Sequence, residues 1–393
     1  MRRRLIGSLV AAAMALAGLA AGSAAAAAQP GPGGPTYRRV CPERNVPGKA
    51  FCLSMVRTDL PARPSLLPGQ QPAGLSPQDI RSAYGLPPFG GDGRRIAIVV
   101  ANDYPEAEQD LAVYRRQFHL PPCTTANGCF RKVYSTGTKP GTVDPIWALE
   151  AGLDMQAVSA TCPGCGITLV EAPTAFIVSS LLPAVDIASF LPGVTGVNGS
   201  WAVAEQAAEG SLDSHFRPGL VYTFASGDVG GVPVYPSVSP NVTSVGGTKL
   251  TRAFNLRGWT ESAWGGTGGG CSPYEPQPAF QQGFAPCATR STPDISAVAD
   301  PDTGMAAYVS TPGNPTVGWQ VVGGTSLSSP LVAGMYALAG RPGPADRPNS
   351  YPYARPGSFH DIVTGVAGPY AAIPGYDRAT GIGTPRGLRG LRR

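Results

Sequence analysis

A serine at the junction of a predicted strand and a predicted helix is the first residue that could do chemistry. Residues 317–322 contain bulky, β-prone side chains, and the Gly-Gly pair that follows ends the strand. The helix predicted over 327–339 is apolar on every side, so we expect it to run through the core, with Pro330 in its first turn. Ser326 then lies at a helix N-terminus, where backbone N–H groups and the helix dipole favour the negative charge that develops when a nucleophile reacts. The alternative is that Ser326, or its neighbour Thr325, serves only as the helix N-cap.

Two acidic residues one helical turn apart form a second candidate group. Glu150 and Asp154 are four residues apart on a helix predicted over 144–160, and they share a face whose other side chains are apolar. Two carboxylates on such a face repel each other and resist burial, which favours shared protons and shifted pKa values. If this face is instead exposed, the two residues are ordinary solvated acids.

A third acid follows a predicted strand. The apolar strand predicted over 220–226 ends at Ser226, and Asp228 comes next in a glycine-rich turn. Ligand sites of open α/β sheets lie at the carboxyl ends of strands, so Asp228 could belong to a site. The alternative is an ordinary turn aspartate, which is the more common case.

A histidine base is missing from these candidate groups. A nucleophilic serine of the Ser-His-Asp type needs an imidazole as its general base. The chain contains His119, His215 and His360, and none of them stands in a His-Gly-Thr setting beside a strand end. If Ser326 is a nucleophile, we therefore expect its base to be a carboxylate.

Taken in order along the chain, these motifs resemble those of the sedolisins, or serine-carboxyl peptidases. The resemblance runs from about residue 75 to residue 385, and it rests on an ordered set of motifs rather than on any single one. The matching segments are, in chain order, 75–87 for the mature N-terminus, Glu150-Ala-Gly-Leu-Asp154 for the Glu-x-x-x-Asp helix, 199–205 for the Ser-Tyr-Gly-x-x-Glu segment, Ser226-Gly-Asp228, Gly324-Thr-Ser326 for the nucleophile, and 359–362 with 374–383 for a C-terminal calcium loop.

The resemblance implies a fold and a division of roles. The implied fold is α/β and subtilisin-like, with a parallel, seven-stranded-type sheet, helices on both faces and a single catalytic domain. In the implied mechanism Ser326 attacks the scissile carbonyl, and Glu150 acts as general base. Asp154 holds Glu150 in place, and Asp228 donates a proton or hydrogen bond to the oxyanion. The implied activity is that of a secreted serine-type endopeptidase acting on protein or peptide substrates.

These roles predict activity at acid pH. A carboxylate has an unperturbed pKa of about 4, against about 6.5 for histidine, so it remains a usable base in acid. Asp228 can donate to an oxyanion only if its pKa is raised enough to keep the side chain protonated. We therefore expect an activity that fades as the pH rises towards neutrality.

The resemblance also implies one bound Ca²⁺ near the C-terminus. Asp361 and Asp377 would supply carboxylate ligands. The backbone carbonyls that would add further oxygen ligands are those of Ile362, Ile373 and Gly375, with water completing the shell. Ile373 stands where the family usually has glycine, so the carbonyl is kept while the torsions of the loop can differ.

The elements that must position these groups alternate between strands and helices. Such alternation predicts a parallel sheet covered on both faces. Strands are predicted over 95–100, 130–134, 166–172, 194–200 and 220–226, and helices over 75–84, 106–118, 144–160, 177–190, 202–215 and 327–339.

We expect four segments along the chain. Residues 1–28 have the basic start, apolar middle and alanine-rich end of a secretory signal peptide. Residues 29–74 are rich in Pro and Gly, which predicts a loosely folded pre-region or a short propeptide, too short for the long folded prosegment that sedolisins usually carry. Residues 75–385 form the sedolisin-like peptidase domain, which includes the calcium loop at 359–383. A basic tail follows at 386–393.

Composition limits the classes of partner. With 52 Gly, 42 Pro and 14% charged residues, the 393-residue chain is loop-rich and weakly charged. Three of its net +5 charges are Arg2, Arg3 and Arg4 in the signal segment, so removal of that segment leaves +2, which gives no support for nucleic-acid binding. We expect a secreted, extracellular monomer that has no membrane anchor once the signal is cleaved.

Eight cysteines in an exported chain predict disulfides. Their spacing favours four local pairs, namely Cys41–Cys52, Cys123–Cys129, Cys162–Cys165 and Cys271–Cys287. The Cys162-Pro-Gly-Cys165 run also fits a redox or half-zinc pattern. No second Cys-x-x-Cys or His pair completes a metal site, so we favour a tight structural loop there.

Two other functions are open at this stage. The Gly-Thr-Ser-x-Ser-x-Pro run at 324–330 also fits a subtilisin-type serine protease, although such an enzyme needs a His-Gly-Thr segment that the chain lacks. The other alternative is a catalytically silent secreted binding protein on the same scaffold. All four expected catalytic positions carry the required residue types, which favours the enzyme.

Overall fold

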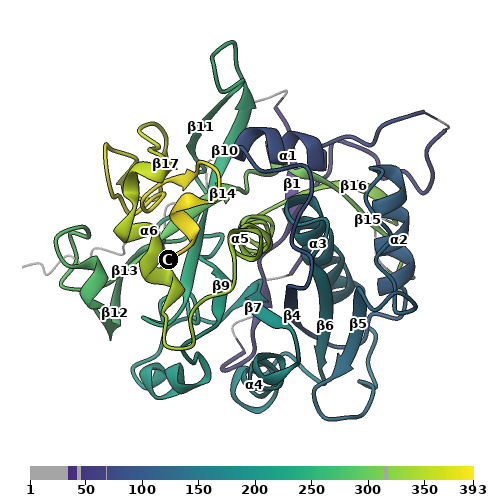
Figure 1. The fold of residues 1–393 in the computed structure, drawn as a ribbon, viewed down its shortest axis with the longest axis horizontal. Helices are drawn as coiled ribbons and strands as arrows, with labels where there is room; N and C mark the ends of the chain where they lie inside the picture. Colours follow the sequence, from purple (N-terminus) through teal and green to yellow (C-terminus); the bar gives the residue numbers. More distant parts are fainter. Residues whose placement is uncertain (1–33, 42–45, 68, 314–316) are drawn as a thin grey trace, which may run out of the picture.

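The computed structural model describes residues 34–41, 46–67, 69–313 and 317–393, so the predicted signal segment 1–28 lies outside the described residues. The largest sheet has eight strands (Figure 1). Its strands are, in spatial order, β11 (Trp259–Ala263), β10 (Thr243–Arg252), β9 (Val221–Ala225), β7 (Val194–Gly199), β4 (Arg95–Ala101), β6 (Gly166–Ala172) and β5 (Phe130–Tyr134), with β14 (Ile295–Val298) also paired to β10. Every neighbouring pair is parallel except β10 with β11, so seven strands run parallel as predicted.

Helices cover both faces of this sheet because its central strands are apolar on both sides. Every residue of β4 is buried, which is typical of a strand in the middle of a parallel sheet. α3 (Pro145–Thr161) and α5 (Thr325–Ala339) pack on one face, and α4 (Leu182–Phe190) packs on the other (Figure 1). The remaining helices are α1 (Pro77–Tyr84), α2 (Ala107–Gln117) and the short α6 (Tyr351–Ala354).

Local sequence explains where two of these helices begin. Ser76 and Asp79 form a capping box at the start of α1, in which each side chain accepts a hydrogen bond from the backbone of the other residue. The Asp144 side chain caps α3 by accepting from the Ile146 N–H at 2.9 Å. In both helices a proline follows the cap directly, where its missing N–H has no cost.

The core helix α5 begins two residues earlier than predicted. Its N-cap is Gly324, with φ of 93°, so Thr325 and Ser326 both lie in the first turn and neither caps the helix. Pro330 consequently falls inside the helix, and its missing N–H leaves the Ser326 carbonyl without a helical donor. The Ser200 hydroxyl donates to that carbonyl at 3.4 Å instead. The interpretation of Ser326 as an N-cap is therefore wrong, and its side chain is available for other contacts.

α3 and α5 lie side by side and run in the same direction. A Cβ atom on Gly334 of α5 would lie 2.1 Å from the Thr161 hydroxyl of α3, so only glycine permits this close approach. Every residue of α5 up to Leu338 is buried, which confirms the prediction of a helix through the core. The close packing brings the N-terminal half of α3, with its two acids, beside the first turn of α5.

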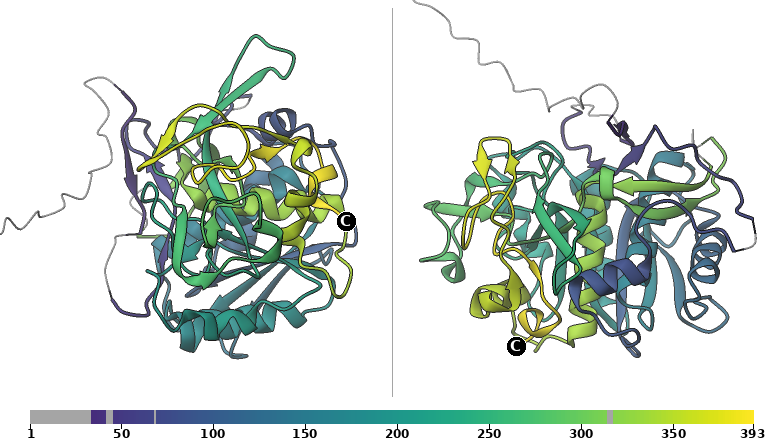
Figure 2. Two further views of the ribbon diagram at one scale, coloured as in Figure 1. Left: turned by 90° about the vertical axis from the view of Figure 1, so that its left-hand side faces the viewer. Right: turned by 90° about the horizontal axis from the view of Figure 1, so that it is seen from above.

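A second sheet brings the N-terminal segment onto the body of the protein (Figure 2). It is antiparallel, with the spatial order β1 (Tyr37–Arg39), β3 (Met55–Arg57), β16 (Gly318–Gly323) and β15 (Met305–Val309). A separate pair joins β2 (Phe51–Cys52) to β8 (Trp201–Ala202). The described part of the predicted pre-region is thus more ordered than expected, because strands too short to show periodicity find their partners far along the chain.

The helix predicted over 202–215 is wrong for most of its length. Its first residue belongs to β8, and helical structure is confined to a 3-10 helix at Glu209–His215. The Glu209 carboxylate accepts a hydrogen bond from the Gln206 N–H at 2.7 Å, and local bonds of this kind compete with helix formation. The other predicted strands and helices are present, with small shifts of their ends.

Small ribbons and disulfides complete the fold. The remaining two-stranded pairs are β12 (Gly270–Pro276) with β13 (Thr289–Thr292), β17 (Phe359–His360) with β20 (Thr384–Pro385), and β18 (Val366–Ala367) with β19 (Tyr370–Ala371). All four predicted disulfides are present: Cys41–Cys52, Cys123–Cys129, Cys162–Cys165 and Cys271–Cys287. The Cys-Pro-Gly-Cys run therefore closes a structural loop, as expected.

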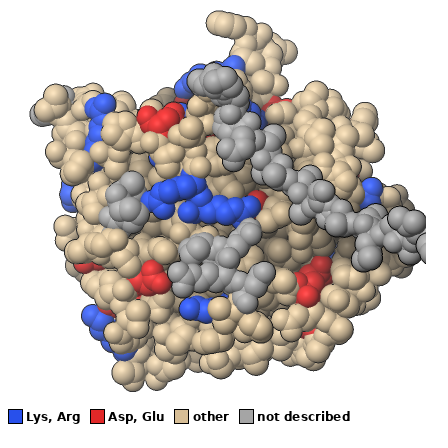
Figure 3. Space-filling view, turned by 180° about the vertical axis from the view of Figure 1, so that it is seen from behind, with Lys and Arg blue, Asp and Glu red and all other residues tan. Residues whose placement is uncertain are grey.

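Charged side chains are sparse on the surface. Figure 3 shows a face on which most atoms belong to uncharged residues, with one compact group of Lys and Arg and several small separate groups of Asp and Glu. This distribution follows from the low charged fraction of the sequence. Over the part of the chain that the structure describes, no helix is both long and apolar enough to cross a membrane.

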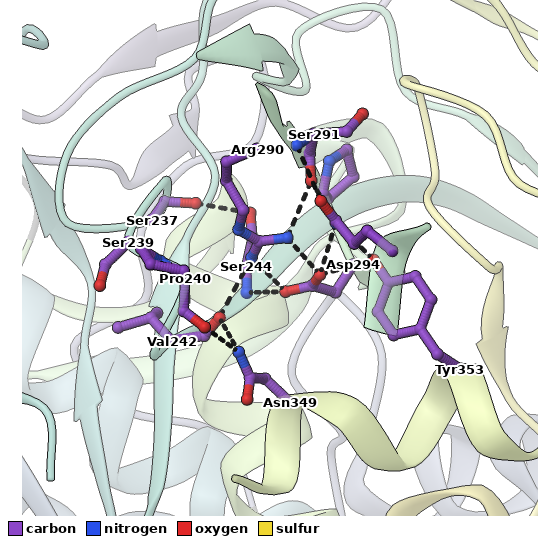
Figure 4. Close-up of polar contacts among 12 residues, drawn as sticks. Ser237, Ser239, Pro240, Val242, Ser244, Arg290, Ser291, Asp294, Asn349 and Tyr353 are labelled. Carbon is purple, nitrogen blue, oxygen red and sulfur yellow. Dashed lines mark hydrogen bonds and ion pairs between the residues drawn. The ribbon is translucent and has the colours of Figure 1, made fainter. Parts of the chain in front are cut away.

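A buried ion pair fastens the main sheet to the C-terminal part of the chain (Figure 4). Arg290 and Asp294 are completely buried, and two guanidinium nitrogens each donate to a carboxylate oxygen at 2.6 Å. Asp294 also accepts from the Tyr353 hydroxyl of α6 at 2.6 Å and from the Ser244 N–H of β10 at 2.8 Å. Arg290 donates in turn to the Val242 carbonyl at 3.1 Å. One ion pair therefore links elements that are distant in sequence.

Replacement of Asp294 by Ala should lower the free energy of unfolding by about 3–5 kcal/mol, because Arg290 would stay buried without its partner. Chemical denaturation followed by tryptophan fluorescence measures this loss. Lys139→Ala is the matched control, since it breaks the exposed Lys139–Asp103 pair (3.0 Å) and should cost less than about 1 kcal/mol. Equal losses in the two variants would contradict the importance assigned to the buried pair.

Candidate active site

Four predicted site residues converge from three parts of the fold. Ser326 lies in the first turn of α5, Glu150 and Asp154 lie on α3, and Asp228 follows β9. The first three side chains are completely buried, and Asp228 is 4% exposed. Glu150 lies close enough to Ser326, Asp154 and Asp228 for each contact to shift a pKa. The structure therefore brings together the serine and the three acids that the sequence singled out.

The Ser326 hydroxyl makes contacts that suit a reactive group. It donates to the Ser200 carbonyl at 3.3 Å and accepts a hydrogen bond from the Leu53 N–H at 3.1 Å. The Ser326 N–H, at the N-terminal end of α5, donates to the Leu53 carbonyl at 3.2 Å. Backbone N–H groups at a helix start stabilise negative charge, so this N–H could serve an oxyanion.

Two polar residues orient Asp154, and the sequence analysis did not single them out as site residues. Asp154 accepts from the Ser200 hydroxyl at 2.7 Å and from the Asn198 side-chain amide at 3.1 Å. Asn198 is itself fixed, because its amide oxygen accepts from Thr223 at 3.0 Å and from Ser329 at 2.7 Å. The signal that could have found them is the Asn-Gly-Ser run that ends a buried apolar strand, where polar side chains need partners.

Glu150 differs from Asp154 in its surroundings. Within the described residues, no hydrogen bond of ordinary geometry reaches either of its carboxylate oxygens. Burial raises the pKa of Glu150 to about 8, and the charge of Asp228 acts in the same direction. The nearby hydroxyls of Ser326 and Ser54 and the backbone of Leu53 lower the pKa, but they do not cancel the effect of burial.

The two acids on α3 titrate as a pair. Burial raises the pKa of Asp154 well above its ordinary value, and the charge of Glu150 raises it further, against the hydrogen bonds from Ser200 and Asn198. Since ionisation of both acids is costly, the pair keeps a proton over a wide pH range. A pair with one proton retains one carboxylate, which can accept the proton of the adjacent Ser326 hydroxyl.

Asp228 lies on the opposite side of the helix start. One of its carboxylate oxygens accepts from the Thr325 N–H at 2.8 Å and from the Thr325 hydroxyl at 2.7 Å. A Cβ atom on Gly324 would lie 2.7 Å from the second carboxylate oxygen and 2.1 Å from the Leu53 carbonyl oxygen, so this position requires glycine. The Leu53 carbonyl oxygen therefore lies between the Ser326 N–H and the Asp228 carboxyl group.

Histidines take no part in this arrangement. Among the described residues, no histidine hydrogen-bonds to Ser326, Glu150 or Asp154. His215 pairs with Asp186 at 2.8 Å instead, and burial together with the charge of Arg257 lowers the pKa of His360 on β17 to about 4. The base next to Ser326 is thus a carboxyl group, as the sequence predicted.

A stretch of the N-terminal segment passes directly over Ser326. Residues 48–57, called the crossing segment below, include Leu53, whose N–H and carbonyl both contact Ser326, and Ser54, whose hydroxyl lies near Glu150. Leu53 and Ser54 are 2% and 1% exposed. The sequence analysis missed this contact, because the Pro- and Gly-rich pre-region carries no periodic pattern and its partners lie far along the chain.

The residues of the expected calcium loop lie elsewhere in the fold. Asp377 accepts hydrogen bonds from the N–H groups of Ile373, Ala379 and Thr380, and Asp361 accepts one from the Gly375 N–H. Both carboxylates thus contact the loop at 373–375, which offers the all-oxygen ligands that Ca²⁺ prefers. A group of three or more His, Cys, Asp or Glu side chains suited to a metal does not occur in the described part of the chain, so the expected set depends on two carboxylates and backbone carbonyls.

Comparison with known proteins agrees with this geometry. Residues 188–350 match the Subtilase family (Peptidase_S8). Kumamolisin from Bacillus sp. (strain MN-32) is 30% identical over 363 residues, which cover 81% of this chain and 63% of kumamolisin. The chain belongs to the sedolisin family. Tripeptidyl-peptidase 1 from Macaca fascicularis is 30% identical over 212 residues, 42% of this chain and 36% of that relative.

The solved structures bear out the subtilisin-like α/β fold expected for a sedolisin-family chain. Pseudomonas sedolisin (serine-carboxyl proteinase), complexed with two molecules of pseudo-iodotyrostatin, superposes with a TM-score of 0.68 at 24% identity. The superposition covers 81% of this chain and 96% of that one. The chain spans less than two thirds of the length of the curated relatives it matches.

The thermal stability of this sedolisin-family chain should fall as the pH rises from about 4.5 to about 8. Burial raises the pKa of Glu150, Glu209 and Glu275 to about 8 and that of Glu171 to about 7. These folded-state values exceed the unfolded value of about 4.5, so the folded chain holds more protons across this window, and a rising pH favours unfolding. We expect the Tm to drop by at least about 5 °C between pH 4.5 and pH 8 in differential scanning fluorimetry.

Glu209→Gln should reduce this dependence, because the neutral amide resembles the protonated acid. The matched control is Glu108→Gln, which changes an exposed glutamate and should leave the slope unchanged. A Tm that rises from pH 4.5 to pH 8 would show that the buried acids are ionised in the folded chain.

Proposed function

We propose that this chain is an exported serine-type endopeptidase that hydrolyses peptide bonds at acid pH. Ser326 is the nucleophile, Glu150 and Asp154 form the base, and Asp228 with the Ser326 N–H stabilises the oxyanion. The observation that carries the proposal is the contact of a buried serine hydroxyl with a buried acid pair and with no imidazole.

The proposed reaction follows from where these groups lie. The Ser326 oxygen forms a bond to the scissile carbonyl carbon while its proton passes to the acid pair. The negative charge that collects on the carbonyl oxygen is met by the Ser326 N–H and by a protonated Asp228. Collapse of this intermediate breaks the C–N bond, and the pair returns its proton to the leaving amine. A water molecule then repeats the sequence on the acyl-enzyme and releases the carboxylic acid product.

Acid conditions suit this division of roles. Asp228 can donate to an oxyanion only while it is protonated, and an acid pair with one proton offers one carboxylate as base. As the pH rises, Asp228 loses its proton and the pair becomes fully ionised, so both functions fail together.

Endopeptidase action is the proposed mode, although tripeptidyl-peptidase 1 is among the relatives. The crossing segment continues past Ser326 in both directions, with residues 48–52 on one side of Leu53 and 54–57 on the other. A peptide following the same path has no need to end three residues before the cleaved bond. A catalytically silent binding protein is less favoured, because all four catalytic side chains are present and in contact.

Export is supported by two features of the chain. Residues 1–28 have the pattern of a signal peptide, and eight cysteines form four disulfides, which persist in oxidising compartments. We propose a secreted, extracellular monomer.

Ser326→Ala should lower kcat for casein-derived peptides by about 10⁴-fold or more, because the acyl-enzyme cannot form. The rate of the unaltered enzyme should be highest below about pH 6 and lost by about pH 8. A peptide-cleavage assay from pH 3 to pH 9 measures both effects. Ser328→Ala is the matched control, since this buried serine on the same helix donates to the Thr325 carbonyl and should leave the rate unchanged. Equal acid proteolysis with and without the Ser326 hydroxyl, or a maximum above pH 8, would reject the proposal.

We also propose that one Ca²⁺ binds at the C-terminal loop, through the carboxylates of Asp361 and Asp377 and the carbonyls of Ile362, Ile373 and Gly375. The support is that both carboxylates contact the loop at 373–375 and that every donor is an oxygen. Such an ion would stabilise the loop and take no part in the chemistry.

Chelation of Ca²⁺ by EDTA should therefore lower the Tm of the purified protein, by about 3 kcal/mol of stability if the ion is present at 100 times its Kd. Asp361→Asn should weaken this effect, and its exposed carboxylate makes it a milder change than loss of buried Asp377. An unchanged Tm after chelation, with Ca²⁺ shown to be absent, would remove the ion from the proposal.

A further inference from the structure

The crossing segment lies in a groove between two edges, as an extended peptide would. On one side, Phe51 and Cys52 pair antiparallel with Ala202 and Trp201 of β8. On the other side, the Ala50 N–H donates to the Ala175 carbonyl and the Ile177 N–H donates to the Gly48 carbonyl, each at 2.8 Å. Addition of a strand between two edges is a general mode of peptide recognition, in which backbone hydrogen bonds supply the affinity.

Beyond Ser326 the segment enters a second strand pairing. Met55 and Val56 pair antiparallel with Gly323 and Val322 of β16, the strand that leads into α5. The chain therefore remains extended and hydrogen-bonded on both sides of the serine. The groove accepts a continuous peptide rather than a chain end.

Leu53 lies where a scissile residue would lie. Its carbonyl is 3.2 Å from the Ser326 N–H and flanks Gly324 together with Asp228, and its N–H is 3.1 Å from the Ser326 oxygen. The bond presented to the nucleophile is thus Leu53–Ser54. Ser54 lies on the leaving side, and its hydroxyl is near Glu150, the group that would return a proton to the leaving amine.

We propose that the crossing segment is an internal substrate analogue that keeps the enzyme latent, and that the pocket around Leu53 selects aliphatic side chains at the residue whose carbonyl is attacked. This inference rests on the proposed function and adds its substrate class and its regulation.

The pocket around Leu53 is apolar and small. The Leu53 side chain packs against Ala202, Ala225 and Val234, which are all buried. The two alanines leave space for a branched aliphatic side chain, and Val234 limits its length. A charged side chain placed there would lose its hydration without gaining a partner, and an aromatic ring would have to displace Val234.

A clamp explains why the segment stays in place. The Cys41–Cys52 disulfide is adjacent to Leu53, and the Val40 N–H donates to the Ser54 carbonyl at 2.9 Å. Arg39 also donates to the Asp228 carbonyl at 2.6 Å. If Ser326 cuts the Leu53–Ser54 bond, these contacts hold both new ends at the site, so the amine can displace Ser326 from the acyl-enzyme and restore the bond. The clamped segment therefore acts as an inhibitor, and release of the clamp turns it into a substrate.

The test compares two disulfide removals. Cys41→Ser with Cys52→Ser should raise acid peptidase activity at least 10-fold over the unaltered chain, and mass spectrometry should find a new N-terminus at Ser54. Removal of the other small disulfide, by Cys123→Ser with Cys129→Ser, is the matched control and should leave the chain latent. Equal activity in the clamped and unclamped chains would overturn the latency.

Specificity is read on the activated enzyme with peptides that differ only at the residue before the cleaved bond. Leu should exceed Lys and Glu in kcat/KM by roughly 10–200-fold. Val234→Ala should shift the Phe-to-Leu ratio towards Phe, and this ratio does not depend on the amount of folded protein. A preference for a charged residue, or a ratio unchanged by Val234→Ala, would overturn the assignment of the pocket.

Binding separates this inference from the proposed chemistry. In the Ser326→Ala background, where no acyl-enzyme forms, the unclamped chain should bind the peptide GKAFSLSMV, which copies the crossing segment with Ser in place of Cys. The same peptide with Glu in place of Leu should bind at least 10-fold more weakly in calorimetry. Binding without peptidase activity in any variant would reject the proposed enzyme and keep the groove. Activity that depends on Ser326, without discrimination between the two peptides, would keep the enzyme and reject the groove assignment.

Discussion

The burial of two carboxyl groups beside a serine hydroxyl is the constraint on which the rest of this structure depends. Glu150 and Asp154 are wholly buried on α3, and burial raises the pKa of both. An acid pair of this kind is costly unless its protons and hydrogen bonds are arranged for it. Asp154 receives two donors, whereas Glu150 receives none of ordinary geometry in the described residues, so Glu150 is the member whose contacts are left for Ser326 and a substrate.

The scaffold meets this constraint through helix packing. Gly334 lets α5 approach α3 closely, and Gly324 lets the chain turn into α5 between Asp228 and Leu53. Pro330 leaves the Ser326 carbonyl without a helical donor, and Ser200 bonds to both that carbonyl and Asp154. A single hydroxyl therefore connects the start of α5 to the acid pair, which fixes the relative position of nucleophile and base.

The crossing segment completes the environment of the acid pair. Leu53 and Ser54 cover Ser326 and contribute to the exclusion of water from Glu150. In this state Glu150 holds its proton, and a protonated carboxyl group cannot act as a base. Departure of the segment would admit water and favour ionisation. The latent arrangement and the pKa of the base are thus two effects of the same cover.

The sequence by itself determined most of the parallel α/β architecture, the four disulfides and the types of the chemical groups, because apolar runs, cysteine spacing and the Glu-x-x-x-Asp repeat are local patterns. It also predicted a carboxyl base, since no histidine stood in a suitable setting. Only the tertiary structure decided the contacts of Ser326, the support of Asp154 by Asn198 and Ser200, and the pairing of the N-terminal strands across the groove. These contacts join residues far apart in the chain through backbone hydrogen bonds and burial, and neither leaves a periodic trace in the sequence.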